Sequence, residues 1–180
     1  MVNIVLPDGT KVNYRDIIKD DPDDLYFLKT MNKFARYTLT FNRGIEPSYS
    51  LYKAVQYVVK NKIPGDFVEC GVWRGGSVIL IALALAHFGD TDRKIFLYDT
   101  FTGMTKPDEQ DVDWDTDWYA STYHELVHLY PIISAGGILI IDDYGWCRGS
   151  RQATDKYIKE HKLDLFLSRI DESVRLAVKR

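Results

Sequence analysis

The sequence predicts a Rossmann-like α/β fold, with a mostly parallel sheet and an antiparallel hairpin at its C-terminal edge. Three observations lead to this prediction. Short apolar runs at 67–70, 94–98 and 138–141 resemble strands buried in a parallel sheet, and stretches with helical character lie between them. A glycine-rich turn follows the first of these runs. Two segments near the C-terminus, 163–169 and 173–179, are spaced to pair as a hairpin.

The first 62 residues are expected to form an N-terminal helical or cap region ahead of an α/β domain at 63–180. A Pro-Asp-Gly turn separates two expected strands, 2–6 and 10–14. The acidic stretch 20–24 suits a solvated helix start better than a cation site, because acids at a helix N-terminus favour the helix dipole. Helices are expected at 25–36 and 48–60.

The remaining elements follow from the same patterns. A helix is expected to begin at or near Ser77 and to run to Ala86, and the strand 94–99 follows it. The next helix is predicted at 122–130, ended by Pro131. After the apolar strand 138–141, a last helix is expected at 152–161.

Composition excludes several classes of function. The chain has 180 residues, 46% of them hydrophobic and 27% charged, which suits one globular domain. A net charge of −3 gives no electrostatic case for nucleic acid. We expect no membrane span and no secretory signal. The two cysteines, Cys70 and Cys147, make no disulfide framework, so a cytoplasmic location is expected.

The glycine-rich turn is the strongest indication of a ligand site. Its pattern, E-x-G-x-x-x-G-G-S from Glu69 to Ser77, is neither the dinucleotide fingerprint nor a P-loop. Glycines there let a ligand approach the backbone, and the following helix offers free N–H groups, although an ordinary tight turn is the alternative. Asp99 ends the next strand, where a carboxylate can hold both ribose hydroxyls; a helix cap or loop aspartate is the alternative.

Three carboxylates form a candidate metal site. Asp142 and Asp143 directly follow an apolar strand, and Asp115 precedes the helix that leads into that strand. Carboxylates that converge in this way suit a hard cation such as Mg²⁺, which can lower the pKa of a substrate hydroxyl. A polar loop with a capping role is the alternative for the Asp-Asp pair. Arg148 and Arg151 come next, as substrate contacts or, more simply, as a solvated helix start.

Several motifs in a fixed order resemble the macrocin O-methyltransferase (TylF/MycF-type) family. They are 37–40, 63–77, 98–104, 115–122, 129–131, 136–137 and 140–145. The resemblance implies a class I S-adenosylmethionine (SAM) methyltransferase fold, dependence on SAM and Mg²⁺, and methylation of a hydroxyl on a sugar in a natural product or glycan. It also implies a tendency to form homo-oligomers. By the resemblance, the SAM site takes Glu69, Gly71, Trp73, Gly75, Ser77, Asp99 and Thr100; the metal takes Asp115, Asp142 and Asp143; and Tyr37 and Thr38 lie over the active site.

The chain departs from that family at one place. Only 16 positions separate Asp99 from Asp115, whereas a single βαβ unit needs roughly 30 residues. The family fold has helices and two strands in this interval, so either the protein has an internal deletion and an incomplete sheet, or a segment is missing from the sequence. An inactive, shortened binding protein is therefore an alternative to an active O-methyltransferase.

A further alternative comes from His124-Glu125-Leu126-Val127-His128, which matches the H-E-x-x-H motif of zinc peptidases. The positions that would complete a longer zinc motif hold Pro131 and Ser134. The same residues suit an amphipathic helix with the imidazoles facing outward, which is the favoured interpretation. No general base can be assigned from the sequence; His124 is a weak candidate.

Overall fold

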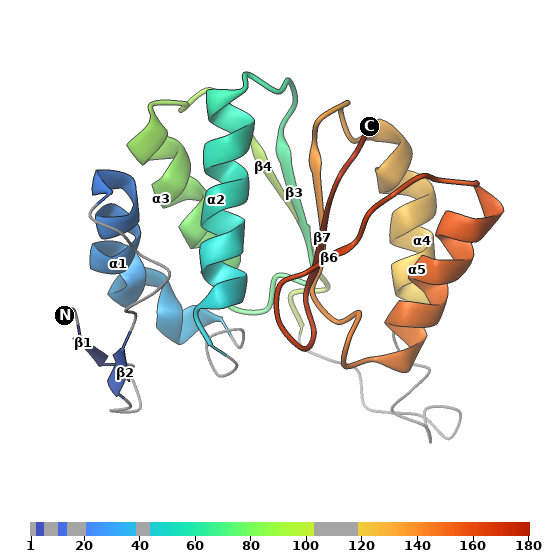
Figure 1. Cartoon of the computed structure of the whole chain (residues 1–180), viewed down its shortest axis with the longest axis horizontal. Helices are drawn as coiled ribbons and strands as arrows, with labels where there is room; N and C mark the ends of the chain where they lie inside the picture. The colour runs from blue at the N-terminus through green and yellow to red at the C-terminus, as the bar shows by residue number, and fades with distance from the viewer. Residues whose placement is uncertain (1–2, 6–10, 14–20, 39–43, 103–118) are drawn as a thin grey trace. The chain divides into compact units, whose positions relative to one another are not determined.

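The computed structural model describes residues 3–5, 11–13, 21–38, 44–102 and 119–180 (Figure 1). The chain folds as two compact units, residues 1–56 with 67–99 and residues 57–66 with 100–180. The sequence-based division at residue 62 stays a prediction.

The first unit contains a strand pair, three helices and a second strand pair. Its elements are β1 (Asn3–Val5), β2 (Lys11–Asn13), α1 (Pro22–Phe34), η1 (Ala35–Tyr37), α2 (Glu46–Lys60, whose last residues belong to the second unit), β3 (Phe67–Cys70), α3 (Gly76–Phe88) and β4 (Ile95–Tyr98). β1 and β2 are antiparallel, as a hairpin around the Pro-Asp-Gly turn predicts. β3 and β4 are parallel, joined through α3.

The acidic stretch is a helix start, and of its described carboxylates Asp21 is exposed whereas Asp23 and Asp24 are half-buried and buried. Asp21 caps α1 by accepting a hydrogen bond from the backbone N–H of Asp23 at 2.9 Å. Asp24 is only 5% exposed and pairs with the Lys53 ammonium at 3.0 Å. The Asp23 carboxylate lies 2.9 Å from Nε2 of His87. These acids therefore fasten α1 to α2 and α3, which the sequence alone did not indicate.

The second unit contains two helices and an antiparallel sheet. Its elements are α4 (Tyr119–Leu129), η3 (Tyr130–Ile132), β5 (Ile138–Ile141), α5 (Arg148–Glu160), β6 (Ser168–Arg169) and β7 (Arg175–Val178). β7 lies between β5 and β6 and is antiparallel to both, so the predicted C-terminal hairpin is confirmed. β6 has two residues, far fewer than the expected 163–169. Leu126, Tyr130 and Tyr157 form a buried cluster that joins α4 to α5.

The described strands do not form one mostly parallel sheet. Their order is β1-β2, β3-β4 and β5-β7-β6, and β3-β4 is the parallel pair among the residues described. Within the same ranges, no helix combines the length and apolar character that a bilayer crossing requires.

Candidate cofactor and metal sites

The turn between β3 and α3 is held to the end of β4 by two hydrogen bonds. The backbone N–H of Gly71 donates to the carbonyl of Tyr98 at 2.9 Å, which extends the parallel ladder past β3. The backbone N–H of Trp73 donates to Oδ2 of Asp99 at 3.0 Å. The structure therefore brings Asp99 to the glycine-rich turn, as the sequence predicted for a ribose-binding carboxylate. A carboxylate has about four acceptor positions, so a bond to Trp73 does not by itself fill it.

Positive φ angles shape this turn. Gly71 and Gly75 have φ of 75° and 77°, and Trp73 takes φ of 48°, which is unusual for a bulky residue. A Cβ on Gly71 or Gly75 would have no heavy atom within 4 Å, so the turn has open space beside it. Gly75 is the N-cap of α3, and no side chain caps the helix there with a hydrogen bond. The helix begins at Gly76, so Ser77, predicted to cap or begin it, is its second residue.

Gly76 has the opposite surroundings. It is buried, and a Cβ there would lie 2.6 Å from Cβ of Thr38 and 2.7 Å from the carbonyl carbon of Tyr37. Only a glycine permits this close approach. The segment predicted to cover the active site therefore packs directly against the first residue of α3. Tyr37 remains 37% exposed, with the Arg36 guanidinium 5.5 Å from the centre of its ring.

The remaining candidates for the cofactor lie at the ends of this strand pair. Glu69 is half-buried on β3, in register with Leu97 of β4, and its Oε2 atom is buried. Thr100 is exposed and belongs to the second unit, where its hydroxyl accepts a hydrogen bond from the N–H of Thr102 at 3.5 Å. Six of the seven predicted cofactor residues thus belong to the first unit.

The Asp142–Gly145 turn after β5 carries two of the three predicted metal ligands. Asp142 is exposed and Asp143 is half-buried. Asp115 lies outside the described residues, and no group of three His, Cys, Asp or Glu side chains within the described ranges could hold a metal ion. Carboxylate oxygens are the donors that Mg²⁺ prefers, and Mg²⁺ is often held by one or two carboxylates together with substrate and water. The two aspartates therefore fit Mg²⁺ in donor type.

The β6–β7 connection holds that turn in place. Ser173 is fully buried; its hydroxyl donates to the carbonyl of Asp142 at 2.5 Å, and its carbonyl accepts from the N–H of Gly145 at 2.8 Å. Asp171 in turn accepts from the N–H of Ser173 at 2.7 Å. Nothing in the sequence pointed to Ser173, because its role depends on the register of β7 against β5, where Arg175 stands opposite Ile141.

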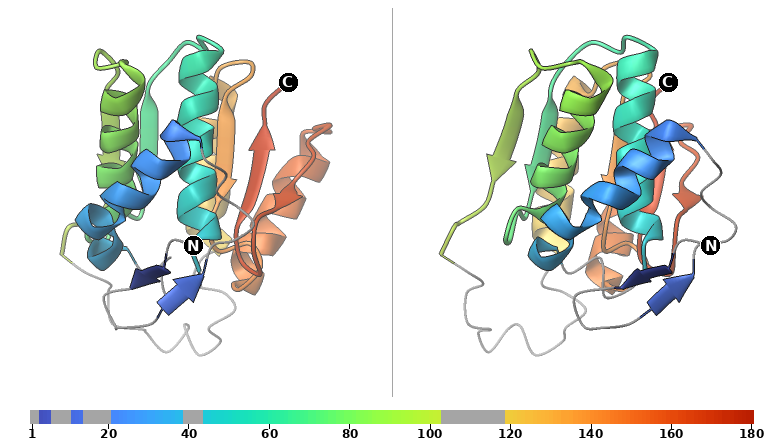
Figure 2. Two further views of the ribbon diagram at one scale, coloured as in Figure 1. Left: turned by 60° about the vertical axis from the view of Figure 1, so that its left-hand side comes forward. Right: turned by 90° about the vertical axis from the view of Figure 1, so that its left-hand side faces the viewer.

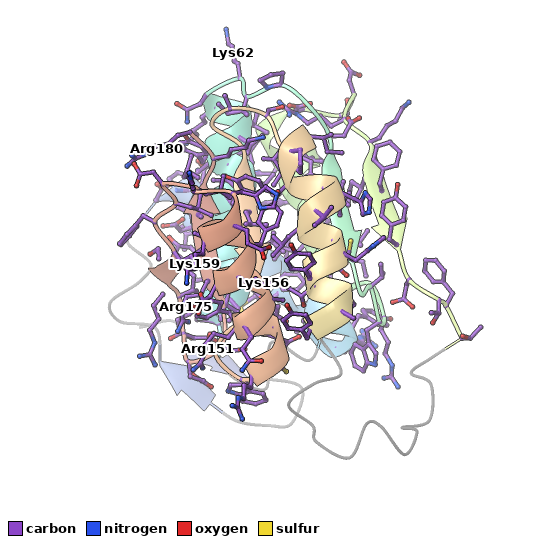
Figure 3. The ribbon with its side chains drawn as sticks, turned by 90° about the vertical axis from the view of Figure 1, so that its right-hand side faces the viewer. Lys62, Arg151, Lys156, Lys159, Arg175 and Arg180 are labelled. Carbon is purple, nitrogen blue, oxygen red and sulfur yellow. The ribbon has the colours of Figure 1, made fainter. Side chains whose placement is uncertain are left out.

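Two arginines also support the turn. Arg151 donates to the carbonyls of Tyr144 and Gly145, at 3.2 Å and 2.8 Å, and Arg175 lies 5.1 Å from the centre of the Tyr144 ring. The Tyr144 hydroxyl donates to Asp155 at 2.7 Å. Figure 3 labels both arginines. α5 begins at Arg148, four residues earlier than predicted, so Arg148 and Arg151 lie in its first turn, in agreement with the helix start favoured for both over substrate contact.

The H-E-x-x-H motif lies on α4. The rings of His124 and His128 are exposed, with their centres 4.3 Å apart. Burial raises the pKa of the Glu125 carboxyl between them. No third described ligand joins the two imidazoles. The geometry agrees with an amphipathic helix that turns its histidines outward.

Many open α/β proteins bind nucleotide-like cofactors with the elements found here: a strand, a glycine-rich turn, a helix and an acid at the tip of the next parallel strand. Comparison with known protein families identifies the family to which the chain belongs. The family model described as Macrocin-O-methyltransferase (TylF) matches residues 37–116 and 110–176, and the chain belongs to this family. The resemblance seen in the sequence is thereby confirmed.

Relatives and a solved structure agree with this assignment. The chain is 28% identical over 174 residues to the demethyldecarbamoylnovobiocin O-methyltransferase of Streptomyces niveus, a match that covers 63% of this chain and 66% of that protein. It is 31% identical over 86 residues to the mycinamicin III 3''-O-methyltransferase of Micromonospora griseorubida, over 48% of this chain and 34% of that one. The structure of the O-methyltransferase NovP matches with a TM-score of 0.68 and 26% identity, over 76% of this chain and 80% of the other.

The alignments also measure the internal deletion. The S. niveus match has 174 positions but spans 63% of 180 residues, about 113, so about 60 positions of that enzyme have no counterpart here. A Streptomyces olivaceus tetracenomycin 4'-O-methyltransferase, 28% identical, matches over 186 positions, 71% of this chain (about 128 residues) and 71% of that protein. It leaves about 58 positions without a counterpart. The two parts of the family match meet at 110–116, which locates the break near Asp115.

Proposed function

We propose that this chain is an O-methyltransferase that binds SAM at the turn between β3 and α3. The hydrogen bond from Trp73 N–H to the Asp99 carboxylate carries the proposal, because it fixes the acid beside the open, glycine-lined turn. Membership of an O-methyltransferase family supports the choice of cofactor.

Each residue of the turn has a physical role in this proposal. Gly71 and Gly75 leave room for the cofactor to approach the backbone, since nothing lies within 4 Å of a Cβ built on either. Asp99 accepts hydrogen bonds from the ribose hydroxyls. The N-terminus of α3 offers backbone N–H groups to the cofactor's carboxylate. Glu69, Trp73, Ser77 and Thr100 complete the proposed site, and Tyr37 and Thr38 cover it.

For the metal, we propose Mg²⁺ held by Asp142 and Asp143 together with Asp115. When bound, Mg²⁺ would lower the pKa of the acceptor hydroxyl. SAM, when bound, would supply the methyl group: the acceptor oxygen would bond to the methyl carbon as the carbon–sulfur bond gives its electron pair to sulfur, and the hydroxyl proton would pass to solvent or a base. His124 remains a weak candidate for that base, since it is exposed beside His128.

The names of the relatives guide the proposed acceptor. One methylates a position of a rhamnosyl tetracenomycin, and another acts on mycinamicin III. We therefore infer a small-molecule acceptor with a hydroxyl, most simply on a sugar of a natural product or glycan. We propose a cytoplasmic location and a homo-oligomeric enzyme as further expectations.

Calorimetric titration of the full chain with SAM tests the cofactor site. We expect saturable binding, weakened at least about 100-fold in Asp99→Ala, because two hydrogen bonds to a charged group contribute about 3 kcal/mol or more. The exposed Asp92, seven positions earlier, provides a matched control: Asp92→Ala should bind like the parent chain. A cooperatively folded chain that ignores SAM would refute the proposal.

A second candidate is a shortened, inactive relative that survives as a binding protein. The absence of about 60 positions present in two enzymes favours it. For such a binding protein, we expect a chain that folds cooperatively but gives no SAM binding in the titration. Repeating the titration with Mg²⁺ separates a chain that retains only the cofactor site from one that retains the metal site as well.

A further inference from the structure

Two histidines stand one turn apart on α4. His124 and His128 are four positions apart, and side chains at this spacing are neighbours on the surface of a helix. The centres of their rings are 4.3 Å apart, and the ring planes are tilted by 56°. Because both residues belong to one helix, their spacing is set within α4 alone.

The pair lies on the side of α4 that faces away from the core of the second unit. Leu126 is two positions from each histidine and is buried in the cluster with Tyr130 and Tyr157. Two positions along a helix correspond to a rotation of about 200°, so the imidazoles lie opposite Leu126. α4 runs beside α5, as Figure 3 shows, and is the yellow helix of Figure 2.

The other two histidines of the chain are held by partners. Nε2 of His87 lies 2.9 Å from the Asp23 carboxylate, and Nδ1 of His161 lies 3.0 Å from a carbonyl oxygen one turn earlier in α5. Among the residues that the structure describes, none forms a hydrogen bond or an ion pair with His124 or His128. A neutral imidazole has one acceptor nitrogen, which is the atom that binds a metal ion. The pair on α4 therefore offers two such nitrogens side by side.

We propose that His124 and His128 together bind one divalent transition-metal ion, of the class of Zn²⁺, Ni²⁺ and Cu²⁺, with water in its remaining positions. Imidazole nitrogen suits these ions, whereas Mg²⁺ prefers oxygen ligands. Metal–nitrogen bonds of about 2.0–2.1 Å in a tetrahedral site put the two nitrogens about 3.4 Å apart. Rings whose centres are 4.3 Å apart reach this separation by rotation of exposed side chains.

Two protein ligands distinguish this site from a zinc-peptidase centre. Catalytic zinc sites have three protein ligands, and no described residue adds a third to this pair. The proposal therefore concerns metal binding and not peptide hydrolysis. It does not rest on the proposed methyltransferase function, because none of the residues proposed to bind SAM or Mg²⁺ takes part.

Calorimetric titration of the full chain with Zn²⁺, at about pH 8 and with Mg²⁺ in excess, tests the proposal. At this pH protons compete little for imidazole, and Mg²⁺ competes for carboxylates but not for histidines. We expect Zn²⁺ affinity to fall at least about tenfold in His124→Gln and in His128→Gln, since losing even a group that only supports a metal ligand costs about 10–100-fold. His161→Gln, a change at an exposed histidine of the same unit, is the matched control and should bind Zn²⁺ like the parent chain.

A second measurement locates the ion independently of affinity. Cu²⁺, added well below one equivalent, should broaden the imidazole proton signals of His124 and His128 together in NMR spectra, before that of His161. Unchanged Zn²⁺ affinity in His124→Gln, or an equal loss in His161→Gln, would overturn the proposal. Zn²⁺ binding that occurs only with dimerisation in sedimentation would overturn it too, because the two ligands would then come from two copies. Affinity that is lost in both α4 variants and kept in His161→Gln is the supporting result.

Discussion

A methyl group added at Gly76 tests how tightly the Tyr37–Thr38 segment packs against the start of α3. The new Cβ would lie 2.6 Å from Cβ of Thr38 and 2.7 Å from two backbone atoms, Thr38 N and Tyr37 C. Carbon atoms in optimal contact are about 3.5–4.0 Å apart. The overlap of about 1 Å involves backbone, so a change of rotamer cannot relieve it.

Two opposing effects set the magnitude. Alanine is favoured over glycine in a helix by at most about 1 kcal/mol. Overpacking of this kind costs about 1–3 kcal/mol. We therefore expect Gly76→Ala to lower the free energy of unfolding by about 1–2 kcal/mol, or to displace the Tyr37–Thr38 segment. For a chain of this size, the loss corresponds to about 2–8 °C in melting temperature.

Urea unfolding followed by circular dichroism measures the change, and Ala82→Gly calibrates it. Ala82 is an exposed residue of the same helix, so its replacement should cost about 1 kcal/mol through helix propensity alone. If Gly76→Ala instead stabilises the chain by a similar amount, the close approach of Tyr37 and Thr38 is wrong. A stable variant with altered Tyr37 fluorescence would show that the segment has moved.

Three further predictions concern the second unit. A Cβ on Gly145 would overlap the carbonyl oxygen of Glu172, so Gly145→Ala should lower the free energy of unfolding by about 3 kcal/mol or more in urea titrations. Ser173→Ala leaves the Asp142 carbonyl without its buried donor and should cost about 1–3 kcal/mol by the same assay. Burial raises the pKa of the Glu125 carboxyl above its ordinary value, so the folded state binds this proton more tightly than the unfolded state does. Stability should therefore fall as the pH rises from the unfolded-state pKa of Glu125 to its folded-state pKa. Glu125→Gln should flatten that slope and stabilise the chain at pH 7; an unchanged slope would contradict the assignment.

The glycine-rich turn could be predicted from the sequence because each of its features follows directly on a recognisable apolar strand. Gly71 and Gly75 mark positive φ angles, and Asp99 ends the next apolar strand, so the two strand tips were expected to meet. The same reasoning predicted a helix start at 20–24 but not the burial of Asp24, because its partner Lys53 is 29 positions away.

Contacts between segments far apart in the chain could not be predicted from the sequence. Glycine at 76 indicated a close approach, but no pattern told which segment fills it; the structure places Tyr37 and Thr38 there. Ser173 supports the Asp142–Gly145 turn only because β7 pairs with β5 in one register. A strand register follows from the buried faces and turn lengths together, which a single sequence does not fix.

The missing segment should affect the candidate metal site more than the candidate cofactor site. The contacts that shape the cofactor turn run between Gly71 and Asp99, on the near side of the break, and they are intact. The proposed metal site requires Asp115, which lies at the break, to join Asp142 and Asp143 on the far side. Affinity for SAM should therefore be the more robust property of this chain. Titrating Mn²⁺ as a probe of the proposed metal site should give weaker binding in Asp115→Asn than in the parent chain, because the proposal counts Asp115 among the three ligands. Unchanged Mn²⁺ affinity in Asp115→Asn would refute the three-carboxylate site and leave Asp142 and Asp143 as its ligands.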